Sequence, residues 1–235
     1  MFFAKYDRFL DTSETAAHPL RLRLRHRAIV RDNAEILDGA RVLDIASHDG
    51  RWSFAAQHAG AAHTTGIEAR AELVDNAVAN FTHYGIPEDR FSFVHGDAVD
   101  VLSAPDHGIR ADVVMCLGFL YHTIRYPELF LGIRSVAPTY LLVDTAVWPA
   151  KQLVLKINTE DVTVQSQAAD GTQAFGGRML VGRPSPPALE FLLRSYGFDV
   201  VKRFDWQGML ANRSGINPVS TYASGRRVTW LCRMR

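Results

Sequence analysis

Apolar runs and amphipathic segments alternate along most of the chain. From position 41 onward, each short apolar run is followed by a stretch with apolar residues at helical spacing, which predicts strands and helices in turn. The expected strands are 42–45, 64–68, 91–95, 112–117 and 140–144, and the expected helices are 51–58, 71–84 and 127–136. This order predicts a doubly wound α/β fold, in which a mostly parallel sheet carries helices on both faces.

The segments on either side of this pattern differ from it. Residues 1–40 have helical spacing, and Pro19 is suited to the first turn of a helix. Residues 146–183 alternate like one or two antiparallel strands, which predicts an insertion over the carboxyl edge of the sheet. The last expected elements are a helix at 187–196 that Ser185 caps, strands at 200–205 and 227–234, and a long polar loop at 206–225. We expect one domain over residues 1–235, with seven strands.

Composition and charge narrow the class of protein. The chain of 235 residues is 47% hydrophobic and 22% charged, which is typical of an ordinary globular domain. A net charge of +1 gives no general attraction to nucleic acid or to an anionic membrane. Lys5, Asp7 and Arg8 interrupt the apolar core that a signal peptide needs, and no stretch approaches the roughly 18 apolar residues of a membrane span. We therefore expect a cytoplasmic protein, with Cys116 and Cys232 as buried, reduced thiols.

The loop after the first strand, in RVLDIASHDGRWS (41–53), combines acids with a single glycine, Gly50. In an open α/β sheet a ligand binds beside this loop, at the carboxyl ends of the strands. The pyrophosphate of a dinucleotide would meet Asp44 and Asp49 there, and two like charges about 4 Å apart repel by roughly 4 kcal/mol at an effective dielectric constant near 20. A nicotinamide-dependent dehydrogenase is therefore disfavoured.

S-adenosylmethionine suits the same acids better, because it carries an ammonium and a sulfonium. Glu68 ends the second expected strand, where its carboxylate could accept hydrogen bonds from both ribose hydroxyls. Asp97 follows the third expected strand and could accept from the adenine amino group. Together with Asp44, these acids stand at the carboxyl ends of three successive strands. They predict a site for S-adenosylmethionine.

The motifs VLDIASHDG, GIE, GDA and VVMCLGFLYH resemble those of class I S-adenosylmethionine-dependent methyltransferases, a likeness that covers about residue 41 to the end. It implies a Rossmann-like fold with an antiparallel final strand, and helices of residues 1–40 as a lid. The cofactor contacts that it implies are Arg25, Asp44, Ala46, Ser47, His48, Gly50, Trp52, Glu68, Ala69, Asp97, Ala98, Leu117 and Gly118. Where the family usually has glycines, this chain has Ala46 and His48; we expect a negative φ at Ala46, while His48 could be left-handed.

Two residues are candidates for handling the proton of a hydroxyl acceptor. His122 follows the fourth expected strand, and a histidine with a pKa near 6.5 is a competent base at neutral pH. Asp144 ends the fifth, where resemblance to catechol-type O-methyltransferases implies a magnesium ligand. Those enzymes also carry an Asp after strand four, where this chain has Leu117 and Gly118. A role for His122 in packing and a role for Asp144 as a turn residue remain alternatives.

The acceptor is expected to be a small polar molecule, such as a sugar or an oligosaccharide. The residues expected to line its site are Tyr121, Arg125, Trp148 and Arg183. The arginines at 21, 23, 25 and 27 form either a solvated helix face or, in part, an inward-turned carboxylate site. Two alternatives remain. A methyltransferase acting on RNA is suggested by the short LYH segment, which resembles carboxymethyl-transferring tRNA enzymes. A non-catalytic cofactor-binding protein is suggested by the loop after the first strand, which lacks the usual glycines. The oligomeric state is open, a homodimer included.

Overall fold

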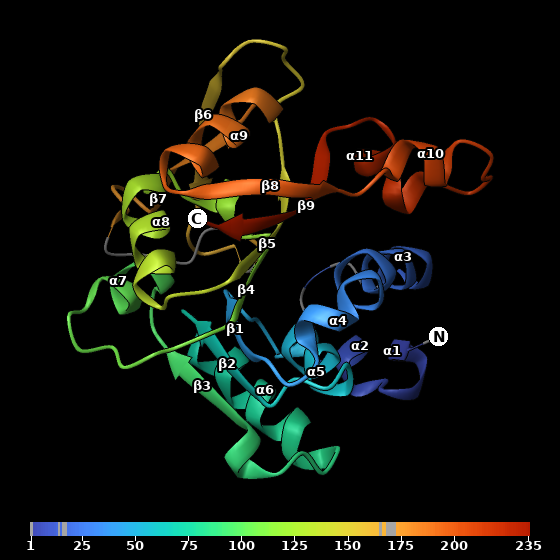
Figure 1. Cartoon of the computed structure of the whole chain (residues 1–235), viewed down its shortest axis with the longest axis vertical. Helices are drawn as coiled ribbons and strands as arrows, with labels where there is room; N and C mark the ends of the chain where they lie inside the picture. Colours follow the sequence, from blue (N-terminus) through green and yellow to red (C-terminus); the bar gives the residue numbers. More distant parts are fainter. Residues whose placement is uncertain (1, 14, 16–17, 165, 168–172) are drawn as a thin grey trace.

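The computed structural model describes all of the chain except residues 1, 14, 16–17, 165 and 168–172. Its centre is a seven-stranded sheet in the order β3-β2-β1-β4-β5-β9-β8 (Figure 1). All pairings are parallel except those of β9, which is antiparallel to both β5 and β8. The strands are β1 (Arg41–Ile45), β2 (His63–Glu68), β3 (Phe91–His95), β4 (Val113–Leu117), β5 (Tyr140–Ala146), β8 (Phe198–Arg203) and β9 (Arg227–Met234). The predicted Rossmann-like sheet with an antiparallel strand near its end is confirmed.

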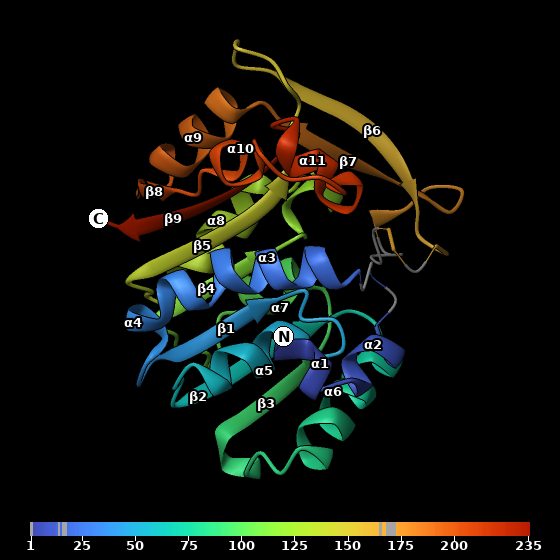
Figure 2. The same cartoon turned by 90° about the vertical axis from the view of Figure 1, so that its right-hand side faces the viewer.

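Two layers of helices cover this sheet, one on each face. The main helices are α3 (Pro19–Ile29), α5 (Arg51–His58), α6 (Ala71–His83), α7 (Ala98–Ser103), α8 (Tyr126–Ser135) and α9 (Pro186–Ser195). Figures 1 and 2 show α7 and α8 on the face opposite to α3 and α5. Short helices precede α3 and follow it: α1 (Phe2–Lys5), α2 (Arg8–Asp11), η1 (Arg31–Asn33) and α4 (Ala34–Leu37).

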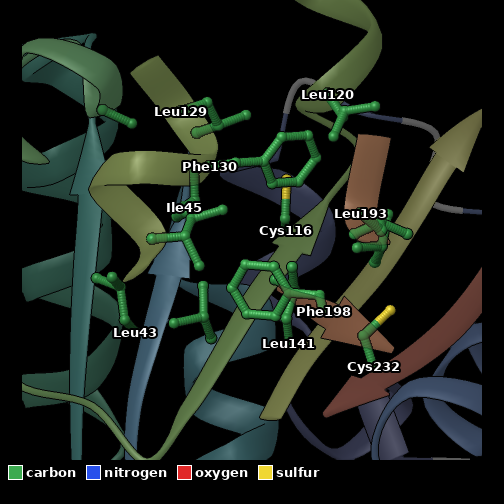
Figure 3. Packing of buried hydrophobic residues seen from close by; sticks show 14 of the residues in the cluster. Leu43, Ile45, Cys116, Leu120, Leu129, Phe130, Leu141, Leu193, Phe198 and Cys232 are labelled. Carbon is green, nitrogen blue, oxygen red and sulfur yellow. The ribbon is translucent and has the colours of Figure 1, made fainter. Parts of the chain in front are cut away.

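The alternation of side chains along each strand divides the hydrophobic core into two parts. Leu43 and Ile45 of β1 pack with α7, α8 and α9 in the cluster that Figure 3 shows. Val42 points to the other face and packs with α3, α5 and α6. Cys116 and Cys232 are buried free thiols, as expected, and burial raises the pKa of each to about 12.

The predicted insertion forms a separate two-stranded antiparallel sheet of β6 (Leu155–Asp161) and β7 (Arg178–Pro184). Figure 2 shows this hairpin on the side of the molecule toward which the parallel strands β1 and β5 point. A backbone bond from Gly182 N–H to the Thr123 carbonyl, 3.1 Å long, ties β7 to the loop after β4. The insertion therefore stands at the carboxyl edge of the main sheet.

The region 206–225, expected as a loop, contains short helices instead. They are α10 (Trp206–Leu210), η5 (Asn217–Val219) and α11 (Ser220–Ala223). Trp206 and Tyr222, with ring centroids 3.9 Å apart, pack on Leu24 and Ala28 of α3. This apolar contact with the N-terminal helix stabilises a segment whose polar composition alone predicts no structure.

The bounds of the other predicted strands and helices agree with the structure to within two residues. The helix α7 has no counterpart among the predicted elements, because it is short and follows directly on the Asp97 turn. The remaining short element, η2 (Glu88–Arg90), leads into β3. Across the described residues, no helix has the length and apolar character needed to cross a membrane.

Candidate functional site

A cavity of about 330 Å³ lies at the carboxyl ends of the parallel strands. It is bounded by the loops after β1, β2, β3 and β4, by α3, and by residues of the β6–β7 insertion. The predicted site residues in its wall are Arg25, Ala46, Ser47, His48, Trp52, Glu68, Ala69, Asp97, Ala98, Leu117, Gly118, Tyr121, His122 and Arg125. Asp44, Gly50, Trp148, Arg183 and Asp144 are outside this lining.

The loop after β1 makes its turn with two left-handed residues that are not glycine. His48 has a φ of 55°, as its residue type allows, but Ala46 has a φ of 54°, so the expectation of a negative φ there is wrong. The left-handed conformation costs an ordinary L-residue roughly 1–2 kcal/mol. Gly50 (φ 79°) lies under the loop, where an added Cβ would come within 3.0 Å of Phe93 and 3.1 Å of Ala77. A side chain at position 50 would collide with Phe93 and Ala77, so glycine suits this position before α5.

Glu68 connects the loops that follow β1 and β2. Its Oε2 accepts a hydrogen bond from the His48 N–H at 2.9 Å, and its Oε1 accepts from the Arg70 N–H at 3.0 Å. The side chain is otherwise buried, with the residue 6% exposed, and it lines the cavity. The carboxylate is therefore held in one orientation, with lone pairs left for ligand hydroxyls.

Asp97 has a double role at the end of β3. Its Oδ1 accepts from the N–H groups of Val99 and Asp100, at 2.9 and 3.0 Å, which caps α7. The residue also lines the cavity, on the same side as Glu68. Asp97, which the sequence predicts on the adenine side of the cofactor, is therefore also the N-cap of α7.

Asp44 lies beneath the cavity wall and not in it. Its Oδ2 accepts from Ser53 Oγ at 2.7 Å, and the residue is 2% exposed. Burial raises the pKa of Asp44 to about 7, and the negative charge of Glu68 acts in the same direction. Asp49 is also fully buried and accepts from Thr12 Oγ1 at 2.8 Å. Both acids of this loop are buried, but Asp49 also lines the cavity, whereas Asp44 does not.

The N-terminal segment contributes Thr15, Arg21 and Arg25 to the cavity wall. Arg25 of α3 lies 4.7 Å from the Trp52 ring centroid, and its buried Nε has no hydrogen-bond partner in the part of the chain that the structure describes. Arg51 donates to the hydroxyls of Ser13 and Thr15. Of the N-terminal arginines, Arg21 and Arg25 face the cavity, whereas Arg23 and Arg27 are exposed.

His122 lies in η3 (Leu120–His122), and its ring contacts the ring of Tyr121, with centroids 4.1 Å apart. Its Nδ1 is 2.5 Å from Oε2 of Glu160, a buried residue on the inner face of β6. A carboxylate can only accept, so Nδ1 carries the hydrogen and Nε2 of the neutral ring has the free lone pair. The sequence analysis did not identify Glu160. Its sequence gives little indication of this role, because Glu160 is simply an acid in a strand of alternating polar and apolar residues.

Asp144 is surrounded by donors that leave no room for a magnesium ion. Its carboxylate accepts from Arg227 Nη2 at 2.6 Å, Arg25 Nη2 at 3.2 Å, Tyr222 Oη at 2.9 Å and Thr229 Oγ1 at 2.6 Å. Burial alone would raise the pKa of Asp144, but the two guanidinium groups hold it well below its usual range. Magnesium prefers six oxygen ligands, several of them waters. No group of three or more residues suited to a metal ion occurs in the described part of the chain, so Asp144 does not fit the predicted metal role.

The four residues expected at the acceptor site lie in different surroundings. Tyr121 and Arg125 line the cavity, and Arg125 Nη2 pairs with Asp100 Oδ1 at 2.7 Å. Trp148 is 37% exposed, with the Lys156 ammonium 3.9 Å from its ring centroid. Arg183 stands behind the wall, 5.8 Å from the Tyr121 ring. Cavity residues that sequence reasoning did not select include Arg21, Arg51, Arg70, Phe119, Gln167, Met179 and Arg227.

Part of the chain matches a known protein domain, and its fold occurs in solved structures. Residues 42–137 match the family model described as a methyltransferase domain. The N-terminal domain of EvdMO1, solved in the presence of SAH and D-fucose, is 18% identical, with a TM-score of 0.60 over 94% of this chain and 86% of that one. DhpI in complex with SAH is 16% identical, with a TM-score of 0.60 over 99% and 94%. The cyclase SpnF is 16% identical, with a TM-score of 0.56 over 86% and 80%. No curated protein matches the chain in sequence.

The fold is Rossmann-like, and the matched part, residues 42–137, holds the strands and loops that build most of the cavity wall. Two of these solved structures of the same fold contain or were solved with SAH. The residues around the cavity fit S-adenosylmethionine: Glu68 presents a fixed carboxylate, and Arg25 has a buried Nε with no hydrogen-bond partner among the described residues. If bound here, S-adenosylmethionine would supply a methyl group from its sulfonium.

Proposed function

We propose that the protein transfers the methyl group to a hydroxyl oxygen of a small polar acceptor, such as a sugar or an oligosaccharide. The observation that carries this proposal is the pair formed by His122 and Glu160 at the cavity wall. An alcohol is nearly as weak an acid as water, whose pKa is about 15.7, so its proton must leave as the new bond forms. The neutral imidazole accepts that proton at Nε2, while the Glu160 carboxylate stabilises the resulting imidazolium.

The rest of the cavity orients the two reactants. Glu68 and Asp97 would hold the nucleoside end of the cofactor, and Arg25 with the loop after β1 would hold its methionine end. Leu117 and Gly118, at the end of β4, line the same cavity as His122 and would be near the group to be transferred. Correct orientation of two reactants can reduce a barrier by roughly 7–11 kcal/mol. The remaining task of the protein is removal of the acceptor proton.

A sugar acceptor is supported by the polar and charged side chains among the cavity-lining residues and by the likeness to the EvdMO1 domain, which was solved with D-fucose present. The two alternatives predict different properties. A methyltransferase acting on RNA needs a basic stripe with aromatic residues, whereas the net charge here is +1. A non-catalytic role is suggested by the loop without its usual glycines and by the likeness to SpnF, a cyclase with this fold. Binding of S-adenosylhomocysteine without turnover of any acceptor would favour that role.

The proposal is tested with the His122→Ala variant and labelled cofactor, on an acceptor found among fractionated sugars and cell metabolites. We expect turnover to fall by roughly 10²–10⁴-fold while the affinity for S-adenosylhomocysteine is unchanged. The wild-type rate should rise with pH through an apparent pKa near that of histidine, and the variant should lose this limb. Wild-type turnover in His122→Ala would overturn the general-base role. A chelator should leave the rate unchanged, because Asp144 has no free oxygen for a metal.

A further inference from the structure

Three arginine side chains of the cavity lining lie near one another, around Asp144 and Tyr222. Arg21 and Arg25 come from α3, and Arg227 comes from the first position of β9. Arg227 Nη1 is 3.4 Å from the Tyr121 hydroxyl, which places this guanidinium beside the loop that carries His122. The same group is 3.2 Å from the position that a Cβ on Gly118 would take, so it borders the end of β4.

The charge of this cluster is only partly balanced. Asp144 forms ion pairs with Arg227 at 2.6 Å and with Arg25 at 3.2 Å, so one carboxylate serves two guanidinium groups. Arg21 has no ion pair within the described residues, and its hydrogen bond to the Pro218 carbonyl is long, at 3.4 Å. Its guanidinium stands 5.3 Å from the Tyr222 ring centroid. Burial is the main cause that lowers the pKa of Arg21; the charges of Arg25 and Arg227 act in the same direction, and Tyr222 and Asp144 act against it.

The cofactor cannot supply the missing negative charge. S-adenosylmethionine has one carboxylate against an ammonium and a sulfonium, so its net charge is positive. Its single carboxylate fits Arg25, which has a buried Nε with no hydrogen-bond partner among the described residues and which stacks on Trp52 of the loop after β1. Arg21 would then still have no anionic partner among the residues that the structure describes. A partly buried charge without a partner is unfavourable, and it becomes favourable when a bound anion pairs with it.

We propose that the methyl acceptor carries an oxyanion, a carboxylate or a phosphate, that Arg21 binds with Arg227 beside it. This inference rests on the proposed function, because it names the acceptor class of the same site. A planar guanidinium with several donors suits both groups, since it can bind two of their oxygens at once. An acceptor anchored in this way directs a neighbouring hydroxyl toward His122. Sugar acids and sugar phosphates are the classes that combine such an anion with a hydroxyl.

The test measures anion binding to the protein saturated with S-adenosylhomocysteine, by NMR of the arginine Nε–H groups during titration with inorganic phosphate or with acetate. We expect saturable binding of at least one anion, weakened by added sodium chloride. Arg21→Gln should weaken it at least about 10-fold, and Arg21→Lys should weaken it less. The matched control is Arg23→Gln, which removes an exposed charge from the same helix and should change nothing. Comparing phosphate with acetate separates the two anion chemistries.

Three outcomes would overturn the inference. The first is that neither anion binds saturably, and the second is that Arg21→Gln binds them as wild type does. The third is a loss of S-adenosylhomocysteine affinity of about 10-fold or more in a folded Arg21→Gln variant, which would assign Arg21 to the cofactor carboxylate. The assay needs no turnover, so its failure is separate from failure of the proposed methyl transfer. A second titration extends it to D-glucuronate, D-glucose 6-phosphate and neutral D-glucose, and the two anionic sugars should bind more tightly than glucose.

Discussion

The carboxylates at the ends of β1, β2 and β3 have three different environments. Glu68 is fixed by two backbone N–H groups at the cavity wall, Asp97 caps a helix, and Asp44 is buried below the wall. Burial raises the pKa of Asp44 to about 7, although this carboxylate also accepts hydrogen bonds from Ser53. One motif position after each strand therefore gives acids that differ in burial and in hydrogen-bond partners.

Glu68→Ala tests the expected ribose contact. The variant should lose about 1–3 kcal/mol of binding free energy for S-adenosylhomocysteine, because the ribose hydroxyls lose their acceptor and must still leave water. Calorimetry measures this change directly. Glu72→Ala, an acid in the first turn of the neighbouring helix α6 with no place in the cavity lining, is the control. Equal affinities for wild type and Glu68→Ala would remove Glu68 from the site.

Asp44 makes cofactor binding dependent on pH. Its pKa, raised to about 7 by burial, means that near pH 7 about half of the free protein holds this carboxyl protonated. A cationic ammonium nearby favours the carboxylate, so binding should lower this pKa, release a proton, and become tighter as pH rises from about 6 to 8. Calorimetry in two buffers of different ionisation enthalpy measures the protons released. Asp44→Asn should bind more weakly and should lose the part of the release that belongs to Asp44; an unchanged proton count would contradict the linkage.

Sequence reasoning found the acids because each follows an apolar run directly, and strand ends are well marked in this chain. It did not find that Ala46 is left-handed or that Asp44 is covered. Both depend on how tightly α5 and the N-terminal segment press on the loop, through contacts such as Thr12 with Asp49. Such contacts join positions 37 residues apart and leave no local pattern.

At the scale of elements, the β6–β7 insertion provides the partner of His122. Alternating side chains in 155–161 predict a strand, and its position after β5 predicts its place at the carboxyl edge. The register of the hairpin then decides which residues face inward: Glu160 pairs with Met179, and both are buried. A sequence without the register cannot distinguish Glu160 from its neighbour Asp161 as the inward acid.

Glu160→Gln tests whether this hairpin positions the base. The amide can still accept from Nδ1–H, but it cannot stabilise an imidazolium by charge, so turnover should fall by roughly 10–100-fold. The acceptor KM and the affinity for S-adenosylhomocysteine should stay unchanged. The pH profile of turnover should differ from that of wild type, because the carboxylate that faces the His122 ring is gone.

The matched control for this variant is Asp161→Asn, which removes the next acid of the same strand. Asp161 Oδ1 accepts only from the N–H and hydroxyl of Thr163 in the bonds seen here, away from the histidine. Its replacement should leave both turnover and the pH profile as in wild type. A Glu160→Gln enzyme with lower turnover but an unshifted pH profile would indicate that Glu160 only supports the packing of the hairpin.

At the scale of the whole molecule, Asp144 joins parts of the chain that are far apart in sequence. It lies at the end of β5 and bonds to Arg25 of α3, to Tyr222 of α11 and to Arg227 and Thr229 of β9. The N-terminal helix and the 206–225 region, packed together through Leu24 and Trp206, are thereby attached to the centre of the sheet. Sequence reasoning identified Asp144 as a strand-end acid but could not predict this arrangement, because its partners lie 78 to 119 residues away.

Asp144→Asn should therefore destabilise the fold and not merely the site. Removing one partner of a buried ion pair typically costs about 3–5 kcal/mol, because the two guanidinium groups remain buried without their carboxylate. Urea denaturation at pH 7 measures the free energy of unfolding. Thr229→Val is the comparison: it keeps the charge of Asp144 but removes the hydrogen bond to that carboxylate and the one that Thr229 Oγ1 accepts from Trp206 Nε1, and it should cost about 1–3 kcal/mol, less than Asp144→Asn.

The pH dependence of the same measurement separates charge from packing. The pKa of Asp144 is held below its ordinary value of 3.8, so its charge stabilises the fold above about pH 4, and this stabilisation is lost as pH falls through the lower, folded-state pKa. The difference in unfolding free energy between wild type and Asp144→Asn should therefore be largest between pH 5 and 7 and should shrink toward pH 2. Thr229→Val keeps the ionisable group, so its difference from wild type should change less over this range. A difference for Asp144→Asn that stays constant from pH 7 to pH 2 would mean that the side chain acts through its shape and hydrogen bonds, and that its charge does not hold the terminal segments to the sheet.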